Sequence, residues 1–437
     1  MSKFATILLA GAMFAALAAP AAGQAPPDNL DQMLDQVLKD NPAPPAKAKA
    51  PAVPVVMSAR IGEHADRTRF VLELSDPVNL RTFTLSNPDR VVIDLPAVAW
   101  HLEGPPRPSG HGAIKSYRYG LFRPGNARVV IDLNQPVAVS DALVIPPEGG
   151  YGYRVVLDLF PTNRTKYDKT AGWPADLKAR ETAAEQVASL PAPSPRGSGH
   201  KVIVIDPGHG GIDAGTSGVN GLLERDLVLD EGLRVAKALR ADPDFTVYMT
   251  RDTDVFIPLR ERVNFSHAHK ADLFISLHAD SNPDSNVSGL SVYTLSESGS
   301  DKEAAALARK ENQSDIIAGV DLGGDNAAVA PILLDLEQRD TMNKSSRFAQ
   351  TVLASLGSAT DILPRQPHRS AAFAVLKGPD VPSVLIELGY LSNDSDAAQM
   401  NTARWRNAVA AAIAGAVERH FAPASASAGP HAAPLSE

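Results

Sequence analysis

The stretch VIVIDPGHGG, residues 202–211, decides the fold of the C-terminal half of this chain. Its run of β-branched residues is typical of a buried strand, and the strand leads into a glycine-rich loop that carries His209. Further along, LFISLH ends at His278, VLIE ends at Glu387, and LLERD places Glu224 at the start of a helical pattern. Ligands of open α/β sheets gather at the carboxyl ends of the strands, so we expect these four side chains to converge.

Strands alternate with helices along residues 200–421, and this order favours a mainly parallel sheet with helices on both faces. After Glu224, apolar residues recur on one helical face, which supports the first helix. The expected strands are VIVID, TVYMT, LFISLH, GLSVYTL, FAVLK and SVLIEL, and the expected helices start at Glu224 and cover 260–270, about 301–317, 341–356 and 402–420. Residues 200–421 are therefore predicted to form an α/β catalytic domain.

The residue types at the strand ends indicate a metal-dependent hydrolase. Two histidines and one carboxylate suit a catalytic Zn²⁺ that keeps one coordination position for water, and a further glutamate could then act as the base. Because the chain has no cysteine, any metal must use histidine and carboxylate ligands. Asp206 is expected to accept a hydrogen bond from His209 and orient its ring.

The N-terminal residues have the composition of an export segment and a tether. Lys3, an apolar run and small residues up to Gly23 predict a signal peptide over residues 1–23. The lack of a twin arginine favours Sec export, with an uncleaved membrane anchor as the alternative. Residues 24–54 are predicted to be an Ala/Pro-rich linker with a short amphipathic helix, which docks either on a partner or on its own domain. We expect a second linker over 162–199 and a disordered tail over 422–437.

One phrase occurs four times within residues 55–161. The copies are RFVLEL at Arg69, RVVIDL at Arg90, RVVIDL at Arg128 and RVVLDL at Arg154. Each is β-branched and is followed by turn residues, which is typical of a strand. Repetition in pairs predicts an all-β sandwich with two similar halves. Residues on its exposed rims could meet a glycan or could be plain surface: Arg81, Tyr117, Arg118, Tyr119 and Arg123.

Charge and composition exclude some classes of protein. The net charge of −8, with acidic and basic residues intermixed, does not indicate a basic surface for nucleic-acid binding. Export without cysteine fits a bacterial periplasm, although that compartment permits disulfides. Beyond the signal peptide, no run is long and apolar enough to predict a transmembrane segment.

The paired RVVIDL phrases of residues 55–161 resemble the AMIN domain, a module that binds peptidoglycan and localises amidases and secretins. The resemblance covers about a quarter of the chain and implies a role in peptidoglycan binding.

Residues 200–421 resemble the zinc N-acetylmuramoyl-L-alanine amidases of the cell-wall lytic type. The matching phrases stand in the family's order: VIVIDPGHGGIDAGTSG, LLERD, MTRDTDVFIPLRERV, ADLFISLHAD, GLSVYTL and AAFAVLKGPDVPSVLIELGYLSN, followed by the closing helix. An AMIN-like module upstream is the pairing found in periplasmic amidases of Gram-negative cell division. The resemblance therefore implies a periplasmic enzyme with peptidoglycan as substrate.

By position, the resemblance implies zinc ligands at His209, Glu224 and His278 and a catalytic glutamate at Glu387. The bond implied is the amide between N-acetylmuramic acid and L-alanine of the stem peptide. Two neighbours of the catalytic glutamate depart from the family: the chain has Leu388 and Tyr390 where Thr and Phe are frequent.

Three further residues are candidates near the site. Asp280 stands where many relatives carry Asn, and it could be an extra metal ligand or could cap the following turn. Arg251 and Arg262 are candidate binders of stem-peptide carboxylates, with a structural salt bridge as the alternative.

Residues 297–370 are longer than one crossover needs, and about 297–345 resemble the helical insert that covers the zinc in division amidases until an activator binds. A carboxylate of the insert, with Glu311 our choice, could take the open zinc position. An apolar set could meet a periplasmic activator protein or could pack on the sheet: Ile316, Ile317, Val329, Leu333 and Leu334.

The leading hypothesis is thus a zinc amidase that splits septal wall and is autoinhibited. Two alternatives remain at this stage: a catalytically idle peptidoglycan-binding scaffold, and a zinc peptidase that acts within the stem peptide.

Overall fold

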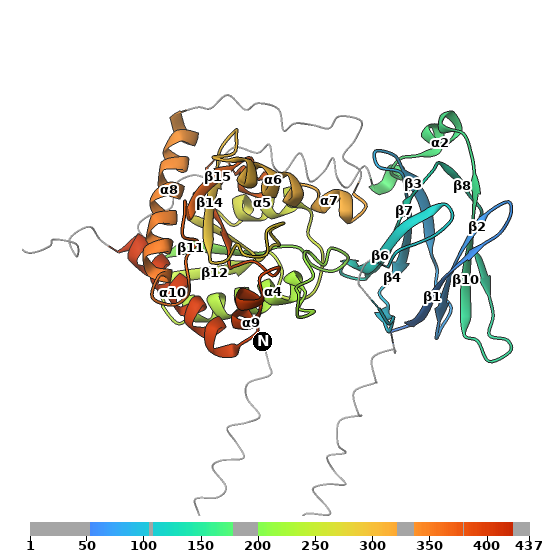
Figure 1. Cartoon of the computed structure of the whole chain (residues 1–437), viewed down its shortest axis with the longest axis horizontal. Coiled ribbons are helices and arrows are strands. Elements are labelled where there is room, and N and C mark those ends of the chain that lie inside the picture. Colours follow the sequence, from blue (N-terminus) through green and yellow to red (C-terminus); the bar gives the residue numbers. More distant parts are fainter. Residues whose placement is uncertain (1–52, 105–107, 178–199, 321–335, 379, 423–437) are drawn as a thin grey trace, which may run out of the picture. The chain divides into compact units, whose positions relative to one another are not determined.

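The computed structural model describes residues 53–104, 108–177, 200–320, 336–378 and 380–422 (Figure 1). The predicted signal peptide and the short amphipathic helix of the N-terminal linker lie outside these residues, as does the predicted tail beyond Ala422. Within the described ranges, no helix combines the length and the apolar character needed to cross a bilayer.

The N-terminal region is built from two sheets. One has the order β5-β1-β2-β10-β8, with β9 paired to β10, and the other has the order β3-β4-β7-β6. Their strands are β1 (Val55–Glu63), β2 (Thr68–Leu74), β3 (Arg81–Leu85), β4 (Arg90–Pro96), β5 (Ala99–Trp100), β6 (Ile114–Arg123), β7 (Asn126–Leu133), β8 (Val137–Val139), β9 (Leu143–Ile145) and β10 (Tyr153–Pro161). Buried side chains of both sheets form one hydrophobic cluster, so the predicted all-β sandwich is confirmed.

The four copies of the repeated phrase pair with one another in matching register. In one sheet β2 and β10 are antiparallel neighbours, and Arg69 lies opposite Asp158. In the other sheet β4 and β7 are antiparallel neighbours, and Arg128 lies opposite Asp94. Each arginine therefore faces the carboxylate of its partner copy, which is the internal pseudo-symmetry that the repetition predicts.

The region after β10 departs from the predicted linker over residues 162–199. Helix α2 (Arg164–Thr170) starts at Asn163, whose side chain accepts from Lys166 N. Tyr167 is buried in the sandwich core, and its hydroxyl lies 2.8 Å from Leu85 O. The first part of the expected linker therefore packs on the β region, because one aromatic side chain fixes it there.

The C-terminal region contains a six-stranded sheet of order β12-β11-β13-β16-β14-β15. Its pairs are parallel except β14 with β16. Its strands are β11 (Lys201–Pro207), β12 (Phe245–Met249), β13 (Leu273–His278), β14 (Ser291–Leu295), β15 (His368–Ala371) and β16 (Ser383–Glu387). The predicted mainly parallel sheet is therefore confirmed.

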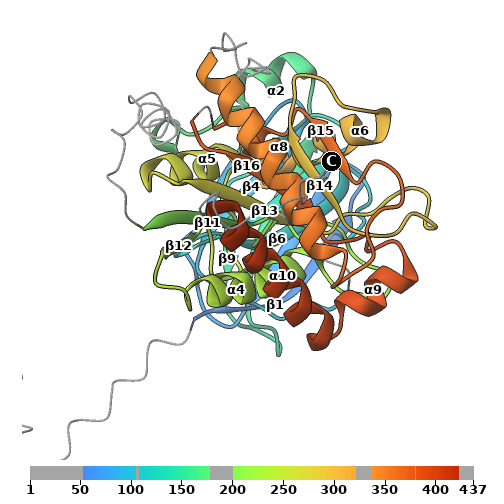
Figure 2. The same ribbon diagram turned by 90° about the vertical axis from the view of Figure 1, so that its left-hand side faces the viewer.

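Helices cover both faces of this sheet. Side chains of α4 (Glu224–Leu239), α8 (Leu336–Leu356) and α10 (Ala403–Phe421) share one hydrophobic cluster with the strands, and α8 and α10 lie across the sheet in Figure 2. Side chains of α5 (Leu259–Ala268) and α6 (Lys302–Glu311) share a second cluster on the opposite face. Alternate residues of β16 enter the two clusters, with Val384 and Ile386 in the first and Leu385 in the second.

Three elements differ from the expected pattern. FAVLK is not a strand: it contains the short 3₁₀ helix η1 (Ala374–Leu376), and its apolar side chains fill the second cluster. The expected helix at 301–317 is two helices, α6 and α7 (Ser314–Ile317). Helix α9 (Asp394–Met400), capped by Asn393, was not predicted. Apolar composition reports burial, and it does not distinguish a strand from a buried turn.

Glu231 of α4 is a buried acid that forms no salt bridge with another of the described residues. It is fully buried, and neither carboxylate oxygen has a hydrogen-bond partner among the described residues. Burial raises its pKa to about 8. The group is therefore protonated at neutral pH.

Candidate active site

The loop after β11 brings His209 to the carboxyl edge of the sheet. His209 has a left-handed backbone with φ of 55°, followed by Gly210 at 120° and Gly211 at 55°. Gly208 is needed for a different reason, since a Cβ there would lie 2.4 Å from the ring of His278. The loop thus leaves room for the second histidine directly beside the first.

His209, Glu224 and His278 meet at one point. Glu224 Oε1 lies 3.1 Å from His209 Nε2 and 3.2 Å from His278 Nδ1. All three side chains are buried, and one ligand atom from each lies within 4.8 Å of the others. They come from the loop after β11, the first residue of α4 and the last residue of β13. The convergence expected from the strand ends is present.

The donor set fits a divalent metal ion. His209 Nε2 is buried and has no hydrogen-bond partner among the described residues, and a cation between the three donor atoms would satisfy it. Burial alone would lower the pKa of His209, but the carboxylates of Glu224 and Asp213 raise it well above its ordinary value. Burial raises and the two histidines lower the pKa of Glu224, which ends well below its usual range. The pocket is thus suited to positive charge.

Glu387 ends β16 and is the register partner of His278. Its Oε2 accepts from the backbone N–H of Asp280 at 3.0 Å, while its buried Oε1 has no partner among the described residues. Burial raises the pKa of Glu387 well above its ordinary value, and the nearby Glu224 and Glu311 carboxylates add to this. A carboxylate with one fixed and one free oxygen is suited to exchange a proton.

Asp213, and not Asp206, orients His209. Asp213 Oδ2 lies 2.9 Å from His209 Nδ1. Asp206 instead accepts hydrogen bonds from Thr250, Ser276 and Arg262 beneath the loop. Asp213 stands four residues after the histidine, where a backbone bridge between Gly210 and Asp213 closes the turn. In the sequence, a carboxylate four residues after a histidine in a glycine-rich loop could have predicted this contact.

Arg251 and Arg262 are buried and make contacts within the protein, which favours the structural alternative over the predicted carboxylate binding. They are 3% and 1% exposed. Arg251 donates to the carbonyls of Pro207, Gly208 and Arg225 at 2.7–3.0 Å. Arg262 donates to the carbonyl of His209 at 2.7 Å and forms the alternative salt bridge, with Asp206, at 2.8 Å. Both guanidinium groups stabilise the loop that carries His209.

Asp280 is not placed as a metal ligand. Its Oδ1 accepts from Thr216 Oγ1 at 2.6 Å and from Lys310 Nζ. It lies outside the group of three residues whose donor atoms converge. Thr216 and Lys310 thus engage the carboxylate oxygen that a metal ion would otherwise need. Its contribution to the site is the backbone N–H that Glu387 accepts.

The predicted insert lies against the site. Glu311, the last residue of α6, places Oε2 3.4 Å from His209 Nε2 and 3.2 Å from His278 Nδ1. Ser314 of α7 donates to Asp213. The cavity beside the histidines measures only about 10 Å³, and Glu311, Asn312 and Ser314 are among its lining residues. Val329, Leu333 and Leu334 lie outside the described residues.

Helix α7 also contacts the β region. Arg90 donates to Ile316 O at 2.7 Å, Arg128 donates to Gly319 O at 3.1 Å, and Arg118 donates to Ile317 O. A hydrophobic cluster joins side chains from the sheet β3-β4-β7-β6, the His209 loop and the insert, including Val130, Ile212 and Ala318. In this conformation the main-chain carbonyls of Ile316 and Ile317 face arginines.

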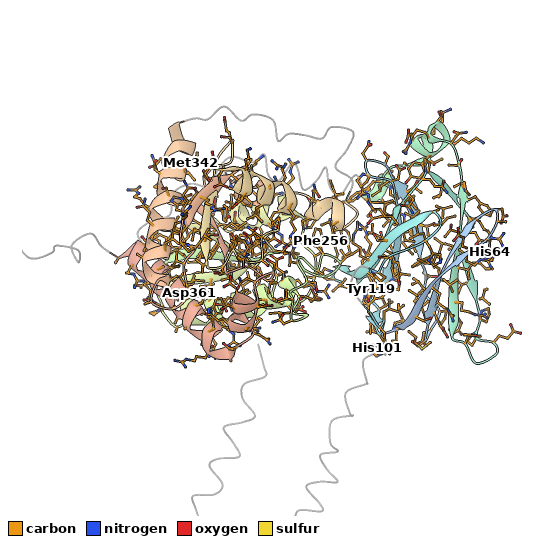
Figure 3. The ribbon with its side chains drawn as sticks, in the orientation of Figure 1. His64, His101, Tyr119, Phe256, Met342 and Asp361 are labelled. Atoms are coloured by element: carbon orange, nitrogen blue, oxygen red, sulfur yellow. The ribbon has the colours of Figure 1, made fainter. Side chains whose placement is uncertain are left out.

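These contacts correct the expected glycan-binding rim. Tyr117 and Arg118 are 8% and 4% exposed. Tyr119, which is labelled in Figure 3, belongs to β6. Its ring packs against that of Trp100 with centroids 4.8 Å apart. Arg81 pairs with Asp176 and Arg123 with Glu261. Tyr117 and Arg118 are therefore packing residues, whereas Arg81 remains exposed within its ion pair.

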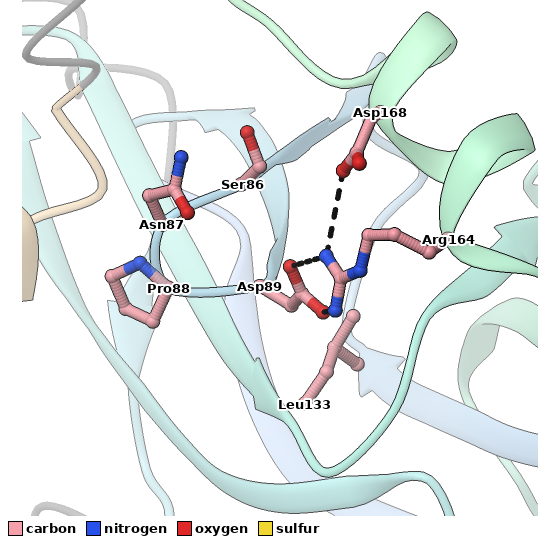
Figure 4. Close-up of a pocket in the computed structure, with 7 residues that line it drawn as sticks. All are labelled: Ser86, Asn87, Pro88, Asp89, Leu133, Arg164 and Asp168. Atoms are coloured by element: carbon pink, nitrogen blue, oxygen red, sulfur yellow. Dashed lines mark hydrogen bonds and ion pairs between the residues drawn. The ribbon is translucent and has the colours of Figure 1, made fainter. Parts of the chain in front are cut away.

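A larger cavity of about 550 Å³ lies in the β region, remote in the sequence from the His-Glu-His group (Figure 4). It is lined by Ser86, Asn87, Pro88, Asp89, Leu133, Arg164 and Asp168. Arg164 donates to both carboxylate oxygens of Asp89, at 2.7 and 2.6 Å. Its charged groups are thus paired with each other, and the converging donors remain the candidate for chemistry.

Comparison with known proteins identifies the families of both regions. A family model described as N-acetylmuramoyl-L-alanine amidase matches residues 203–419, and an AMIN domain model matches residues 58–159. The chain is 34% identical to N-acetylmuramoyl-L-alanine amidase AmiC of Escherichia coli over 85% of this chain and 90% of that protein. It is 34% identical to AmiC of Neisseria meningitidis over 87% and 93%. A solved structure, AmiC2 of Nostoc punctiforme, is 28% identical with a TM-score of 0.37, over 52% of this chain and 99% of that one.

The chain therefore belongs to the N-acetylmuramoyl-L-alanine amidases, hydrolases of the bacterial cell wall. Its α/β region is the amidase domain and its β region is an AMIN domain. Within the family it is a cell-division amidase of the AmiC type, since it aligns with the AmiC relatives along nearly their whole length.

Proposed function

We propose that this amidase is a zinc enzyme of the Gram-negative periplasm that is inhibited by its own insert. In this proposal it hydrolyses the amide between N-acetylmuramic acid and L-alanine in septal peptidoglycan, so that daughter cells separate. The observation that carries the proposal is the convergence of His209, Glu224 and His278, with Glu387 beside them at the end of the neighbouring strand.

His209, Glu224 and His278 would hold the zinc ion through Nε2, Oε1 and Nδ1. When bound, zinc lowers the pKa of a coordinated water and polarises the scissile carbonyl. Glu387 would take the water's proton on its free Oε1 and return it to the leaving amine, while Asp280 N–H keeps Oε2 in place. Asp213 would keep Nδ1 of His209 protonated, so that Nε2 presents its lone pair.

Glu311 would inhibit the enzyme by occupying the side of the two histidines that water and substrate need. Its Oε2 is within 3.4 Å of both imidazoles, and its side chain is 5% exposed. A fourth ligand from the protein leaves no open position, which is the arrangement of a structural metal site rather than a catalytic one. Activation then requires that α6 move.

The cellular part of the proposal depends on residues outside those described. Residues 1–23 would direct Sec export to the periplasm, where the AMIN domain would bind peptidoglycan. A division-associated activator protein would displace the insert, using the apolar residues between α7 and α8. The AmiC relatives and the AMIN match support this assignment.

Hydrolysis of purified wall by the full-length chain tests the inhibitory role of Glu311. Glu311→Ala should raise activity about tenfold or more, the factor that corresponds to 1.4 kcal/mol of lost stabilisation of the closed state. Glu297→Ala, which removes an exposed carboxylate just before α6, is the control. Unchanged activity of a folded Glu311→Ala chain would contradict self-inhibition. Deletion of about residues 305–338 is a weaker test, since it removes Ala308 and Val320 from two hydrophobic clusters.

Metal content and product analysis test the chemistry. His278→Ala should abolish bound zinc in elemental analysis, and a chelator should stop hydrolysis. In the Glu311→Ala chain, Glu387→Gln should lower the rate by about 10²–10⁴-fold. Mass spectrometry should find intact stem peptides that begin with L-alanine. Fragments cut within the stem would favour a peptidase, and an unaffected Glu387→Gln chain would contradict the assigned base.

A further inference from the structure

Helix α6 carries carboxylates at both ends, and each end meets a different part of the sheet. Its C-terminal Glu311 lies at the two histidines. At its N-terminal end, Glu303 Oε2 lies 3.0 Å from Arg369 Nη1, and the N-cap residue Asp301 lies 3.7 Å from the same nitrogen. Between them, Ala304 and Ala308 pack on the sheet. The helix therefore spans the distance from the metal-binding group to Arg369.

Arg369 lies on the same sheet face as Glu387. It is the register partner of Tyr293 in β14, and Tyr293 packs in the cluster beneath α6. Leu385, two residues before Glu387 in β16, is in that cluster too, so side-chain alternation puts Glu387 on this face. Burial and the Glu387 carboxylate raise the pKa of Tyr390, and Arg369 opposes that rise. The phenol thus interacts with both ends of this face.

The separation of Glu387 and Arg369 on the sheet matches the separation of Glu311 and Glu303 on α6. Ser291 pairs with Glu387 and Tyr293 with Arg369, which places Arg369 two strand spacings across and two residues along from Glu387. That is about 12 Å between Cα atoms. Glu303 and Glu311 are eight residues apart on α6, again about 12 Å along the axis. An extended peptide covers about 3.6 Å per residue, so this separation corresponds to about the third residue beyond a cleaved amide.

The guanidinium of Arg369 depends on the insert for its carboxylate partners. Its side chain is only 10% exposed, and its Nε donates to the carbonyl of Gln366 at 3.2 Å. If α6 leaves, both carboxylates leave with it, and a largely buried cation faces the opened groove. A carboxylate of the incoming ligand would then restore a charge-assisted hydrogen bond.

We infer that Arg369 is the subsite for a stem-peptide carboxylate about three residues beyond the scissile amide, and that Asp301 and Glu303 fill this subsite in the closed state. The inference rests on the proposed function, in which α6 moves away from the site. It gives Arg369 the specificity role that the sequence suggested for Arg251 and Arg262. The insert would then imitate substrate at two points, with Glu311 at the reacting end.

Kinetics with defined muramoyl peptides test the subsite. The chains are full-length Glu311→Ala, alone or combined with Arg369→Gln or Arg369→Lys, and Arg365→Gln is the control because Arg365 is an exposed arginine nearby. The substrates are a muramoyl tripeptide with free carboxylates and variants in which one carboxylate at a time is amidated. Amidation of one particular carboxylate should raise KM about tenfold to a hundredfold in the parent and in Arg365→Gln. Arg369→Gln should lose that preference with kcat within about twofold, and Arg369→Lys should keep part of it.

Two outcomes would overturn the subsite: a preference that survives Arg369→Gln, or an equal loss on every substrate. Calorimetric binding of the free stem tripeptide to the same chains gives a readout without turnover. If Glu311→Ala proves inactive, the proposed function fails, yet this titration still decides Arg369. Equal Kd values for the Glu311→Ala chains with Arg369 and with Gln at that position would then refute the inference.

Discussion

The two sheets of the AMIN domain use the same repeated phrase in different surroundings. Arg69 and Asp158 form a two-bonded ion pair with both contacts at 2.7 Å, and Arg128 and Asp94 form the same pair at 2.6 and 2.9 Å. The arginine side chain is 36% exposed in the first pair and 0% in the second. Only the second pair lies beneath α7, where Arg128 also donates to Gly319 O.

The difference in exposure between Arg69 and Arg128 distinguishes the effects of the repeated phrase from the effects of the residues packed on it. The strand register follows from the phrase, so both halves show it, and each half forms one two-bonded arginine–carboxylate pair between its two copies. The free energy lost when one partner is removed depends on how far the pair is exposed to solvent, because a buried charge left without its partner is costly. An exposed pair is screened and contributes little. Matched substitutions in the two halves therefore measure the contribution of the covering helix.

The largest expected effect is the loss of one partner on the covered face. Arg128→Ala leaves Asp94 largely buried without its cation, and should lower the free energy of unfolding by about 3–5 kcal/mol. Arg69→Ala, the matched change on the open face, should cost no more than about 1 kcal/mol. Denaturant titrations of both variants check this. Equal losses would show that α7 does not alter the pair.

Glu231 extends the comparison to a buried acid whose carboxylate oxygens have no hydrogen-bond partner among the described residues. Its pKa of about 8 lies above the ordinary value of 4.5, so its contribution to stability is fully present below about pH 4.5 and is lost as the pH rises through 8. Glu231→Gln should remove this dependence and stabilise the protein at pH 8–9 by about 1–3 kcal/mol. Thermal unfolding of both chains from pH 5 to 9 provides the measurement. Parallel curves would mean that the carboxyl titrates normally.

Close packing on the covered face gives an intermediate effect. Gly319 has φ of 70°, and a Cβ there would lie 2.8 Å from Val130 Cγ2. Gly319→Ala should therefore cost about 2–3 kcal/mol, from backbone strain and overpacking together. Gly125, with φ of 80° and no atom within 4 Å of the Cβ position, is the matched control and should show the backbone cost alone, about 1 kcal/mol. If both variants lose the same stability, Gly319 and Val130 are not in close contact in solution.

Salt should give the smallest difference. A double-mutant cycle on Arg69 and Asp158 should yield a coupling that falls by a few tenths of a kcal/mol between about 0.05 and 0.5 M salt. The corresponding cycle on Arg128 and Asp94 should change less, because the covered pair is shielded from ions. Unfolding titrations at both salt concentrations test this. A stronger salt response of the covered pair would reverse the comparison.

The sequence predicted the fold class and the convergence of His209, Glu224 and His278 because both follow from strand ends. Where a β-branched run stops, the next polar side chain lies at the edge of the sheet, and this placed His278 and Glu387. Strand ends do not predict the partners of an arginine side chain. The reach of Arg251 and Arg262 lets them bind whichever carbonyls the tertiary fold exposes, and here those belong to the His209 loop.

The strand and helix pattern also could not predict which aspartate of a loop contacts His209. Asp213, rather than Asp206, meets His209 because a bridge between Gly210 and Asp213 turns the chain back on itself. Arg369 went unnoticed because its strand was assigned to FAVLK, a few residues too late. Glu311 was placed near the histidines only through the resemblance, since nothing in a helical segment alone says which sheet edge its last residue will reach.

The left-handed backbone of His209 has a consequence for directed evolution. An L-residue with a Cβ pays roughly 1–2 kcal/mol for that conformation, which glycine or asparagine tolerates better. A library randomised at this position and sorted by heat resistance alone should thus enrich glycine and asparagine. Sorting the same library by wall digestion should return histidine. Selection for stability and selection for activity would therefore favour different residues at this position.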